Sequence, residues 1–175
     1  MRHSLGLESD VVRLVEYDAR WPELFAAEQR RIRDHAGALA LRLEHVGGTS
    51  IPHMCAKPIL DIVAGRPPGT PARDYVAALK QAAYDHRGEQ GVQGREFFHR
   101  GQPRAYHVHL VEEGSALWRN YLAFRDYLRA HPMVAGQYAD LKRALAERFP
   151  LDREAYTSAK SARVQEILAL AAGAA

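Results

Sequence analysis

The sequence predicts a single α+β domain built around a small mixed sheet. Two observations lead to this prediction: short apolar runs typical of strands occupy the middle of the chain, and longer segments with helical spacing occupy both flanks. The 175 residues suffice for one domain with its own core, and 47% hydrophobic and 26% charged residues are ordinary values for a globular protein. We expect the domain to span residues 11–172, with short tails at 1–10 and 173–175.

The N-terminal part of the domain is predicted to begin with a strand and a helix. An imperfect alternation of apolar side chains predicts a strand over residues 11–17. Asp18 is positioned to cap the helix that follows, Pro22 suits its first turn, and Gly37 marks its end. Two further strands are predicted, on either side of a glycine-containing turn, at residues 41–46 and 59–64.

A loop, a helix and a hairpin are predicted next. Prolines and a glycine at residues 66–69 mark the loop, and the spacing of apolar residues predicts a helix over 71–84. After a glycine-rich loop, two strands joined by a Gly-Gln-Pro-Arg turn are predicted at residues 95–100 and 106–111. The remainder is helical, with Ser115 as a suitable N-cap. Its three helices are expected at residues 116–130, 133–149 and 152–172.

Charge and cysteine content limit the class of partner. The 24 Lys and Arg residues outnumber the 21 Asp and Glu residues, which is a mild bias toward anionic ligands. No basic stripe with interleaved aromatic residues occurs, and no apolar run reaches the ~18 residues of a membrane span, so the sequence argues against nucleic-acid and membrane partners. A single cysteine and an N-terminus without the apolar core of a signal peptide favour a reducing, cytoplasmic setting. The oligomeric state is left open.

The segment over residues 45–63, HVGGTSIPHMCAKPILDIV, holds the densest group of chemically active residues. Glycines followed by hydroxyls let backbone N–H and side-chain O–H groups converge on a phosphate, so this turn is a candidate phosphate site. A tight turn whose hydroxyl caps a short helix is the structural alternative. The residues of the turn are Gly47, Gly48, Thr49 and Ser50.

Asp61 lies in the middle of the apolar strand that follows this turn. Because a buried carboxylate without a partner is costly, Asp61 needs a metal ion, Lys57, an arginine or hydrogen-bond donors beside it. A catalytic, metal-holding role and a structural salt bridge both satisfy this requirement.

Two histidines offer further metal ligands. His107 and His109 lie two residues apart in a predicted strand, so both imidazoles face the same side of the sheet. They can converge on one metal, or they can be hydrogen-bonded or surface histidines. A site formed by Asp61 with one or both histidines favours Zn, Mn or Ni over Mg.

Basic residues form a third group of candidates. Lys57, Arg95 and Arg104 bracket the predicted cleft in sequence. Arg153, Tyr156 and Lys160 recur on one face of the last helix, where they could bind phosphate, although a solvated helix face or a core position for Tyr156 gives the same pattern. Structural roles are expected for Trp21, Cys55, Trp118, Arg125 and Asp126.

Several motifs in order resemble the GrpB family, formerly an uncharacterised protein family. They are VEYDARWPELFAAE, LEHVGGTSIPHMCAKPILDI, GREFFHRGQPRAYHVHLVEEGSALW, LAFRDYLRAHP and DREAYTSAKS, spread over residues 11–165. The resemblance implies a nucleotidyltransferase-like fold of the polymerase-β type, with a mixed sheet flanked by helices. Where the family usually has Gly-Ser-Thr-Ser and Val-Pro-Gly-Leu, this chain has Gly-Gly-Thr-Ser and Ile-Pro-His-Met at residues 47–54.

The resemblance also implies what the site has lost and kept. Active nucleotidyltransferases pair two acids as D-x-D or D-x-E, but here the position two after Asp61 is Val63, a loss that GrpB proteins share. The third acid of such enzymes corresponds to the strand that carries His107 and His109. The expected function is therefore binding of a nucleotide or phosphate ester, with a divergent transferase assisted by Mg, Mn or Zn as its catalytic form. The alternative is a non-catalytic binding or assembly domain, since GrpB-like sequences also occur fused to dephospho-CoA kinase.

Overall fold

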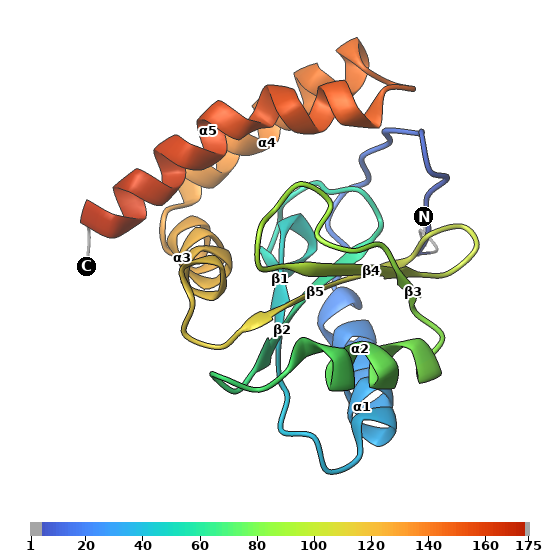
Figure 1. The fold of residues 1–175 in the computed structure, drawn as a ribbon. Helices are drawn as coiled ribbons and strands as arrows, with labels where there is room; N and C mark the ends of the chain where they lie inside the picture. Colours follow the sequence, from blue (N-terminus) through green and yellow to red (C-terminus); the bar gives the residue numbers. More distant parts are fainter. Residues whose placement is uncertain (1–4, 174–175) are drawn as a thin grey trace.

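The computed structural model describes residues 5–173 and contains a five-stranded sheet (Figure 1). Its strands are β1 (Arg42–Val46), β2 (Leu60–Arg66), β3 (Asp85–His86), β4 (Glu96–Arg100) and β5 (Tyr106–Glu112). Their order across the sheet is β1-β2-β5-β4-β3, with β2 and β5 parallel and every other neighbouring pair antiparallel. The sheet is thus mixed, as the sequence predicts.

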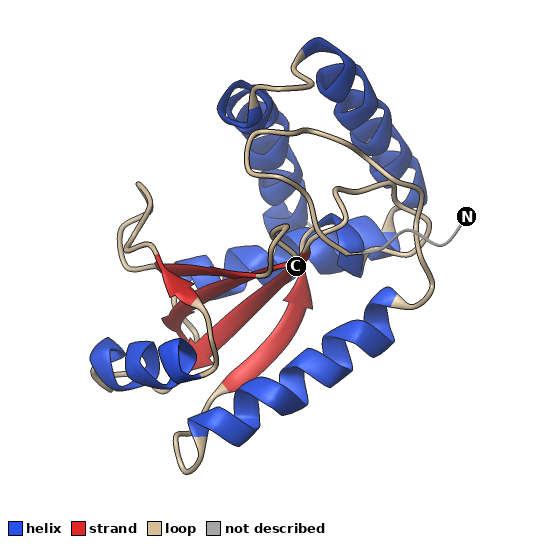
Figure 2. Cartoon of the chain, turned by 90° about the vertical axis from the view of Figure 1, so that its right-hand side faces the viewer, coloured by secondary structure: helices blue, strands red, loops and turns tan. Residues whose placement is uncertain are grey.

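Helices cover both faces of this sheet. They are α1 (Trp21–Ala36), α2 (Ala72–Gln81), α3 (Ala116–Ala130), α4 (Pro132–Arg148) and α5 (Arg153–Gly173), together with a short 3₁₀ turn, Gly48–Ser50. Figure 1 and Figure 2 show α1 and α2 on one side and α3 to α5 on the other. The predicted α+β class, with a helical C-terminal part, is confirmed. In the described part of the chain, no helix is long and apolar enough to span a membrane.

The period of two along β2 separates an apolar face from a face that carries chemistry. Ile62 packs in a core cluster with Ile32 of α1 and Leu79 of α2. On the opposite face, Val63 belongs to a second cluster, which includes Trp118 of α3. Asp61 shares the face of Val63, so its carboxylate is directed to the side of α3, α4 and α5.

Most predicted elements are found with small shifts at their ends. The Ser115 hydroxyl accepts a hydrogen bond from the backbone N–H of Trp118 at 3.2 Å, which confirms the predicted N-cap of α3. Strand β2 continues to Arg66, so the predicted loop begins one residue later, at Pro67. Helix α2 ends at Gln81, because two residues later Ala83 takes a positive φ of 56°.

Two expectations for the N-terminal half of the chain are wrong, and one short strand has no counterpart among the predicted elements. Residues 11–17 form only an isolated bridge between Val15 and Ala56, because the buried residues Val12 and Val15 lie three positions apart and cannot share the face of a strand. Helix α1 has Arg20 at its N-cap position, and the Asp18 carboxylate accepts the Arg20 backbone N–H at 3.0 Å. The two-residue β3 was missed because it is too short to show a pattern.

The segment predicted as an N-terminal tail packs onto the domain from residue 5 onward. Leu7 is 3% exposed and pairs with Arg104, and the Gly6 N–H donates to the Pro58 carbonyl at 2.8 Å. At the other end, Gly173 is the last residue of α5. The remaining positions of the two predicted tails, 1–4 and 174–175, lie outside the described residues.

Candidate functional site

A hydrogen-bonded group of Asp61, His107 and His109 forms the floor of the site. The parallel register pairs Asp61 with His107 across β2 and β5. The Asp61 Oδ1 atom accepts from Nδ1 of His107 at 3.0 Å and from Nε2 of His109 at 3.3 Å. The structure therefore brings together the three side chains that the sequence predicted to converge.

The charge state of this group follows from its surroundings. Burial alone would raise the pKa of Asp61, but the hydrogen bonds from His107 and His109 hold that pKa well below its usual range. Burial lowers the pKa of His107 to about 4, against the opposing effect of Asp61. Asp61 is thus an ionised carboxylate, and the His107 imidazole that donates to it is neutral.

The predicted metal ligands are arranged for hydrogen bonding. Within residues 5–173, no group of three or more His, Cys, Asp or Glu side chains is placed to hold a metal ion. The other ring nitrogens, Nε2 of His107 and Nδ1 of His109, are buried without a partner. This donor set does not fit a formed metal centre, so the metal role of Asp61, His107 and His109 stays a prediction.

Each glycine of the Gly47–Gly48 turn makes room for a charged side chain. Gly47 has a φ of 70°, and a Cβ added to it would lie 2.7 Å from Oδ2 of Asp61. A Cβ added to Gly48 would lie 3.1 Å from Nζ of Lys142. The turn therefore has a steric need for Gly47, whereas a side chain at Gly48 would crowd the movable end of Lys142. Neither contact tests whether the two glycines bind a phosphate.

The two hydroxyls of the turn have different positions. The Thr49 hydroxyl lies 2.9 Å from Nε2 of His45, whose pKa burial lowers to about 4, and Thr49 lines the cavity described below. The Ser50 hydroxyl donates to the Gly47 carbonyl at 2.7 Å and does not line that cavity. The guanidinium of Arg129 donates to the Ser50 carbonyl at 3.0 and 2.8 Å, which fixes the turn against α3.

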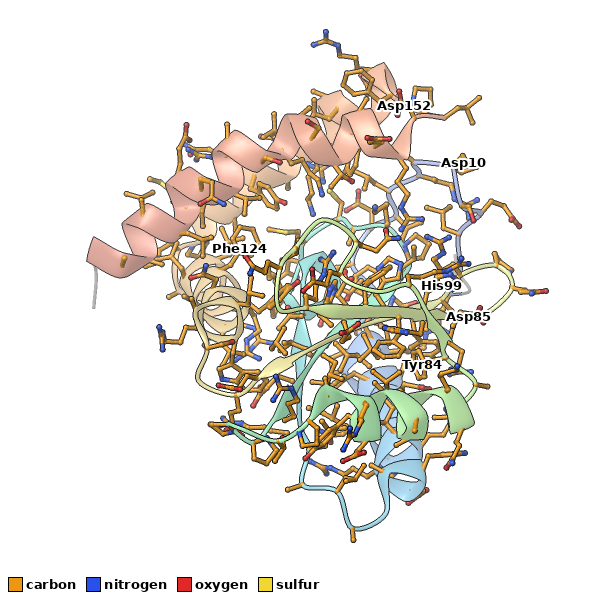
Figure 3. All side chains as sticks on the ribbon, in the orientation of Figure 1. Asp10, Tyr84, Asp85, His99, Phe124 and Asp152 are labelled. Atoms are coloured by element: carbon orange, nitrogen blue, oxygen red, sulfur yellow. The ribbon has the colours of Figure 1, made fainter. Side chains whose placement is uncertain are left out.

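A cavity of about 1220 Å³ opens above the Asp61 face of the sheet. Its walls come from the turn, α4, α5, the loop before β4 and the N-terminal segment. Figure 3 shows Asp10 of that segment between Asp152, just before α5, and His99 on β4. The cationic residues of the lining are Lys57, Arg95, Arg104, Lys142, Arg153 and Lys160.

Three of the four lysines in the chain line this one cavity. The ammonium groups of Lys57 and Lys160 lie 5.3 and 4.6 Å from the ring centroid of Tyr156. Lys142 donates to the Cys55 carbonyl and lies 5.2 Å from the ring centroid of Tyr138. Within residues 5–173, none of the three forms a salt bridge with a carboxylate.

Burial and mutual repulsion make these ammonium groups costly to keep. Burial, together with the charges of Arg153 and Lys160, lowers the pKa of Lys57 to about 7, against the opposing effect of Asp61. Burial likewise lowers the pKa values of Lys142 and Lys160 to about 8. The charge of Asp61 partly offsets this cost for Lys57 and Lys160, and an anion in the cavity would supply further countercharge to all three lysines.

Arginines complete the positive lining. Arg104 donates to the Ser9 hydroxyl at 3.1 Å, and Arg153 donates to the Ser9 carbonyl at 3.2 Å. The guanidinium carbon of Arg95 lies 5.3 Å from the ring centroid of Phe97 on β4. The predicted basic residues thus meet around one cavity, although they are far apart in the sequence.

Lys142 and the Ser9 region are functional candidates that the sequence reasoning missed. Lys142 lies on the buried side of α4 with Tyr138 and Leu145, and a lysine within such an apolar stripe is a signal that could have identified it. Ser9 gives no such signal. The residues expected to be structural are buried or ion-paired: Trp21, Cys55, Trp118, Arg125 and Asp126.

Sequence comparison identifies the family of this chain. The profile described as "GrpB protein" matches residues 11–170. The chain belongs to the GrpB family. A UPF0157 protein of Pseudomonas aeruginosa is 41% identical over 172 residues, which cover 95% of this chain and 70% of the relative. A dephospho-CoA kinase of Mycolicibacterium paratuberculosis is 27% identical over 175 residues, which cover 85% of this GrpB chain but 43% of the kinase.

Solved structures place this GrpB protein in a wider fold group. The crystal structure of GrpB from Enterococcus faecalis superposes with a TM-score of 0.82 at 30% identity, covering 91% of this chain and 96% of that one. The Cid1 poly(U) polymerase, solved with MgGTP bound, gives a TM-score of 0.54 at 9% identity, covering 76% of this chain and 44% of the polymerase. The second likeness concerns the fold alone and confirms the nucleotidyltransferase-like fold that the sequence predicted.

Proposed function

We propose that this GrpB protein binds a nucleotide or another phosphate ester in the lysine-lined cavity. The observation that carries the proposal is the gathering of Lys57, Lys142 and Lys160, three of the four lysines in the chain, in one cavity where none of them forms a salt bridge with a carboxylate of the described residues. Asp61, the carboxylate on the floor, already accepts hydrogen bonds from two histidines. An ammonium group that is desolvated and unpaired is a binding site for an anion.

The proposed ligand contacts follow from the position of each cation. Lys142 lies against Gly48, so it would neutralise a phosphoryl group held at the turn by the backbone N–H groups and Thr49. Lys57 and Lys160, which share the ring of Tyr156, would neutralise a second group. Arg104 lies beside Ser9 on another wall of the cavity and can exchange that contact for a phosphate oxygen.

If the bound ligand also reacts, the proposed reaction is transfer of a nucleotidyl or phosphoryl group. A divalent cation would supply charge neutralisation at the transferred phosphoryl group, with Asp61, His107 and His109 as its predicted ligands. The chain's own lysines would bind and orient the phosphates. Because the Asp61 carboxylate is hydrogen-bonded to both histidines, a cation could bind these three side chains only if those hydrogen bonds were replaced.

A non-catalytic binding or assembly domain is the second candidate. Val63, at the position of the second acid in active nucleotidyltransferases, is fully buried beside Val46, Val111 and Trp118. An apolar residue packed into a core at this position is what a site without transfer chemistry would contain. The dephospho-CoA kinase relative, which is more than twice as long as the region it shares, supports a role as one unit of a larger protein.

A thermal-shift screen tests the proposal. Nucleoside mono-, di- and triphosphates are each added in EDTA and with Mg, Mn or Zn, against potassium chloride at equal ionic strength. We expect at least one phosphate ester to raise the melting temperature beyond the salt control. A melting temperature that no combination changes would contradict ligand binding. Incubation of any ligand so found, followed by ³¹P NMR, then separates transfer or hydrolysis from binding alone.

A further inference from the structure

We propose that the cavity recognises its ligand through a run of phosphoryl groups and accepts any base or sugar attached to them without selection. This inference rests on the proposed function and specifies the class of ligand. Three observations support it. The faces of the aromatic rings are covered, the polar groups near Phe97 are hydrogen-bonded or buried, and the cations are distributed along the cavity wall.

The rings that line the cavity offer no free face for a base. Tyr138 and Tyr156 are 5% and 1% exposed, and each has a lysine ammonium over its ring. Phe97 is partly exposed, but the guanidinium of Arg95 lies over it at 5.3 Å. A base can stack on an aromatic ring only if a face of that ring is accessible, whether or not the stacking is selective. These rings therefore cannot hold a base.

The polar groups near Phe97 are either hydrogen-bonded to the protein or buried. Arg95 donates to the carbonyls of Glu89 and Gln90 at 3.0 and 3.1 Å, which ties it to the loop before β4. His107 and His109 use one ring nitrogen each on Asp61, and their other nitrogens are buried. Selection among bases needs accessible donors and acceptors directed at base edges, and the unpartnered ring nitrogens of His107 and His109 are buried and so not accessible to a base.

The cations, by contrast, extend over more than one phosphoryl group. Arg153 and Lys160 are seven residues apart on α5, which corresponds to about 10 Å along the helix axis. Lys142 approaches from α4, beside Gly48 of the turn. A single phosphate can contact only part of a set of cations distributed along such a wall, whereas a di- or triphosphate can contact more of them in succession.

Calorimetric titration of the full chain tests this inference with ATP, GTP, CTP, UTP, inorganic tripolyphosphate and inorganic phosphate. We expect the four nucleotides and tripolyphosphate to bind within about threefold of one another, and inorganic phosphate to bind at least tenfold more weakly. A tenfold preference among the four bases, tripolyphosphate tenfold weaker than ATP, or phosphate as strong as tripolyphosphate would each overturn the inference. If none of these compounds binds, the proposed function itself fails.

Two variants separate charge from base recognition. Lys160→Met should weaken ATP and tripolyphosphate by the same factor of tenfold or more, whereas the exposed Lys80→Met on α2 should change neither. Phe97→Leu should leave the ratio of the two affinities unchanged, because the ring of Phe97 is covered by Arg95. A Phe97→Leu protein that keeps tripolyphosphate and loses ATP would show base stacking and overturn the inference.

Discussion

Gly47 and Asp61 lie so close together that a Cβ on Gly47 would be 2.7 Å from the Asp61 Oδ2 atom. The contact joins the glycine turn to strand β2, so the two parts of the motif act as one unit. It also places the charged Asp61 carboxylate against a backbone position that has no room for a side chain. The position of the carboxylate therefore depends on Gly47.

Gly47→Ala should destabilise the protein more than backbone strain alone explains. The positive φ costs about 1 kcal/mol for an alanine, and the clash with Asp61 adds to this cost. Gly69 is the matched control, since its φ is 76° and nothing lies within 4 Å of the position that an alanine methyl group would take there. Urea denaturation should show a loss for Gly47→Ala at least twice that for Gly69→Ala. Equal losses would mean that the contact with Asp61 has no energetic weight.

Asp61→Asn tests the role of the carboxylate in the hydrogen-bonded group. We expect the free energy of unfolding to fall by about 1–3 kcal/mol, because His107 and His109 lose a charged acceptor. Any gain in ligand affinity from Mg, Mn or Zn should disappear, while binding in EDTA persists. Asp85→Asn is the control, since Asp85 is a 70%-exposed carboxylate beside His99. If a folded Asp61→Asn protein no longer bound the ligand in EDTA, the carboxylate would be needed for ligand binding itself. That result would contradict a role limited to holding the two histidines and a metal ion.

The lowered pKa values of three lysines make the free energy of unfolding depend on pH. The pKa values of Lys57, Lys142 and Lys160 are about 7, 8 and 8 in the folded protein, against about 10.5 for an unburied lysine. Between pH 7 and pH 9 the unfolded chain therefore binds more protons, so the free energy of unfolding should rise with pH. The upper limit stays below pH 10, where the raised pKa values of Tyr138 and Tyr156 act in the opposite direction.

Urea unfolding at several pH values measures this slope. Lys57→Met should reduce it, and Lys80→Met should leave it unchanged. Saturating tripolyphosphate should also flatten it, because a bound anion favours the protonated lysines. A slope of the opposite sign, or one that Lys57→Met does not alter, would contradict the lowered pKa values of these three lysines.

The ion pairs of Glu28 lie on the face of the sheet opposite the cavity, and we expect them to stabilise the fold. This buried carboxylate accepts from Arg31 at 2.8 Å and from the Tyr84 hydroxyl at 2.7 Å, and it is paired with Arg100 of β4. Glu28→Gln should cost about 3 kcal/mol in chemical denaturation, because it leaves the guanidinium groups without a countercharge. The exposed Glu23→Gln, on the same helix, should cost less than about 0.5 kcal/mol. Similar losses for both variants would contradict the importance of the ion pairs.

The sequence could predict the sheet and one face of the site because both follow from a local period. Alternation along two strands places Asp61, His107 and His109 on one side, and the structure finds them hydrogen-bonded there. The same rule does not apply to residues 11–17, which pack as a loop against Ala56 and Pro150. Irregular segments owe their position to tertiary contacts that leave no periodic signal.

The walls of the cavity were harder to predict. Lys142 and Ser9 reach the site through the packing of α4 and of the N-terminal segment, which no local pattern encodes. The steric roles of Gly47 and Gly48 also depend on which side chains approach the turn, Asp61 and Lys142. A Gly-Gly-Thr-Ser string predicts a phosphate turn equally well whether or not those side chains are present.

The decisive measurement for the anion site is calorimetric titration of tripolyphosphate into the wild type, Lys142→Met and Lys80→Met. We expect equal affinity for the wild type and Lys80→Met, and at least tenfold weaker binding by Lys142→Met. We also expect Lys142→Met to unfold with an equal or higher free energy, because the variant removes a buried cation that forms no salt bridge within residues 5–173. Wild-type affinity in Lys142→Met, or a wild type that binds no phosphate compound, would show that this cavity is not an anion site.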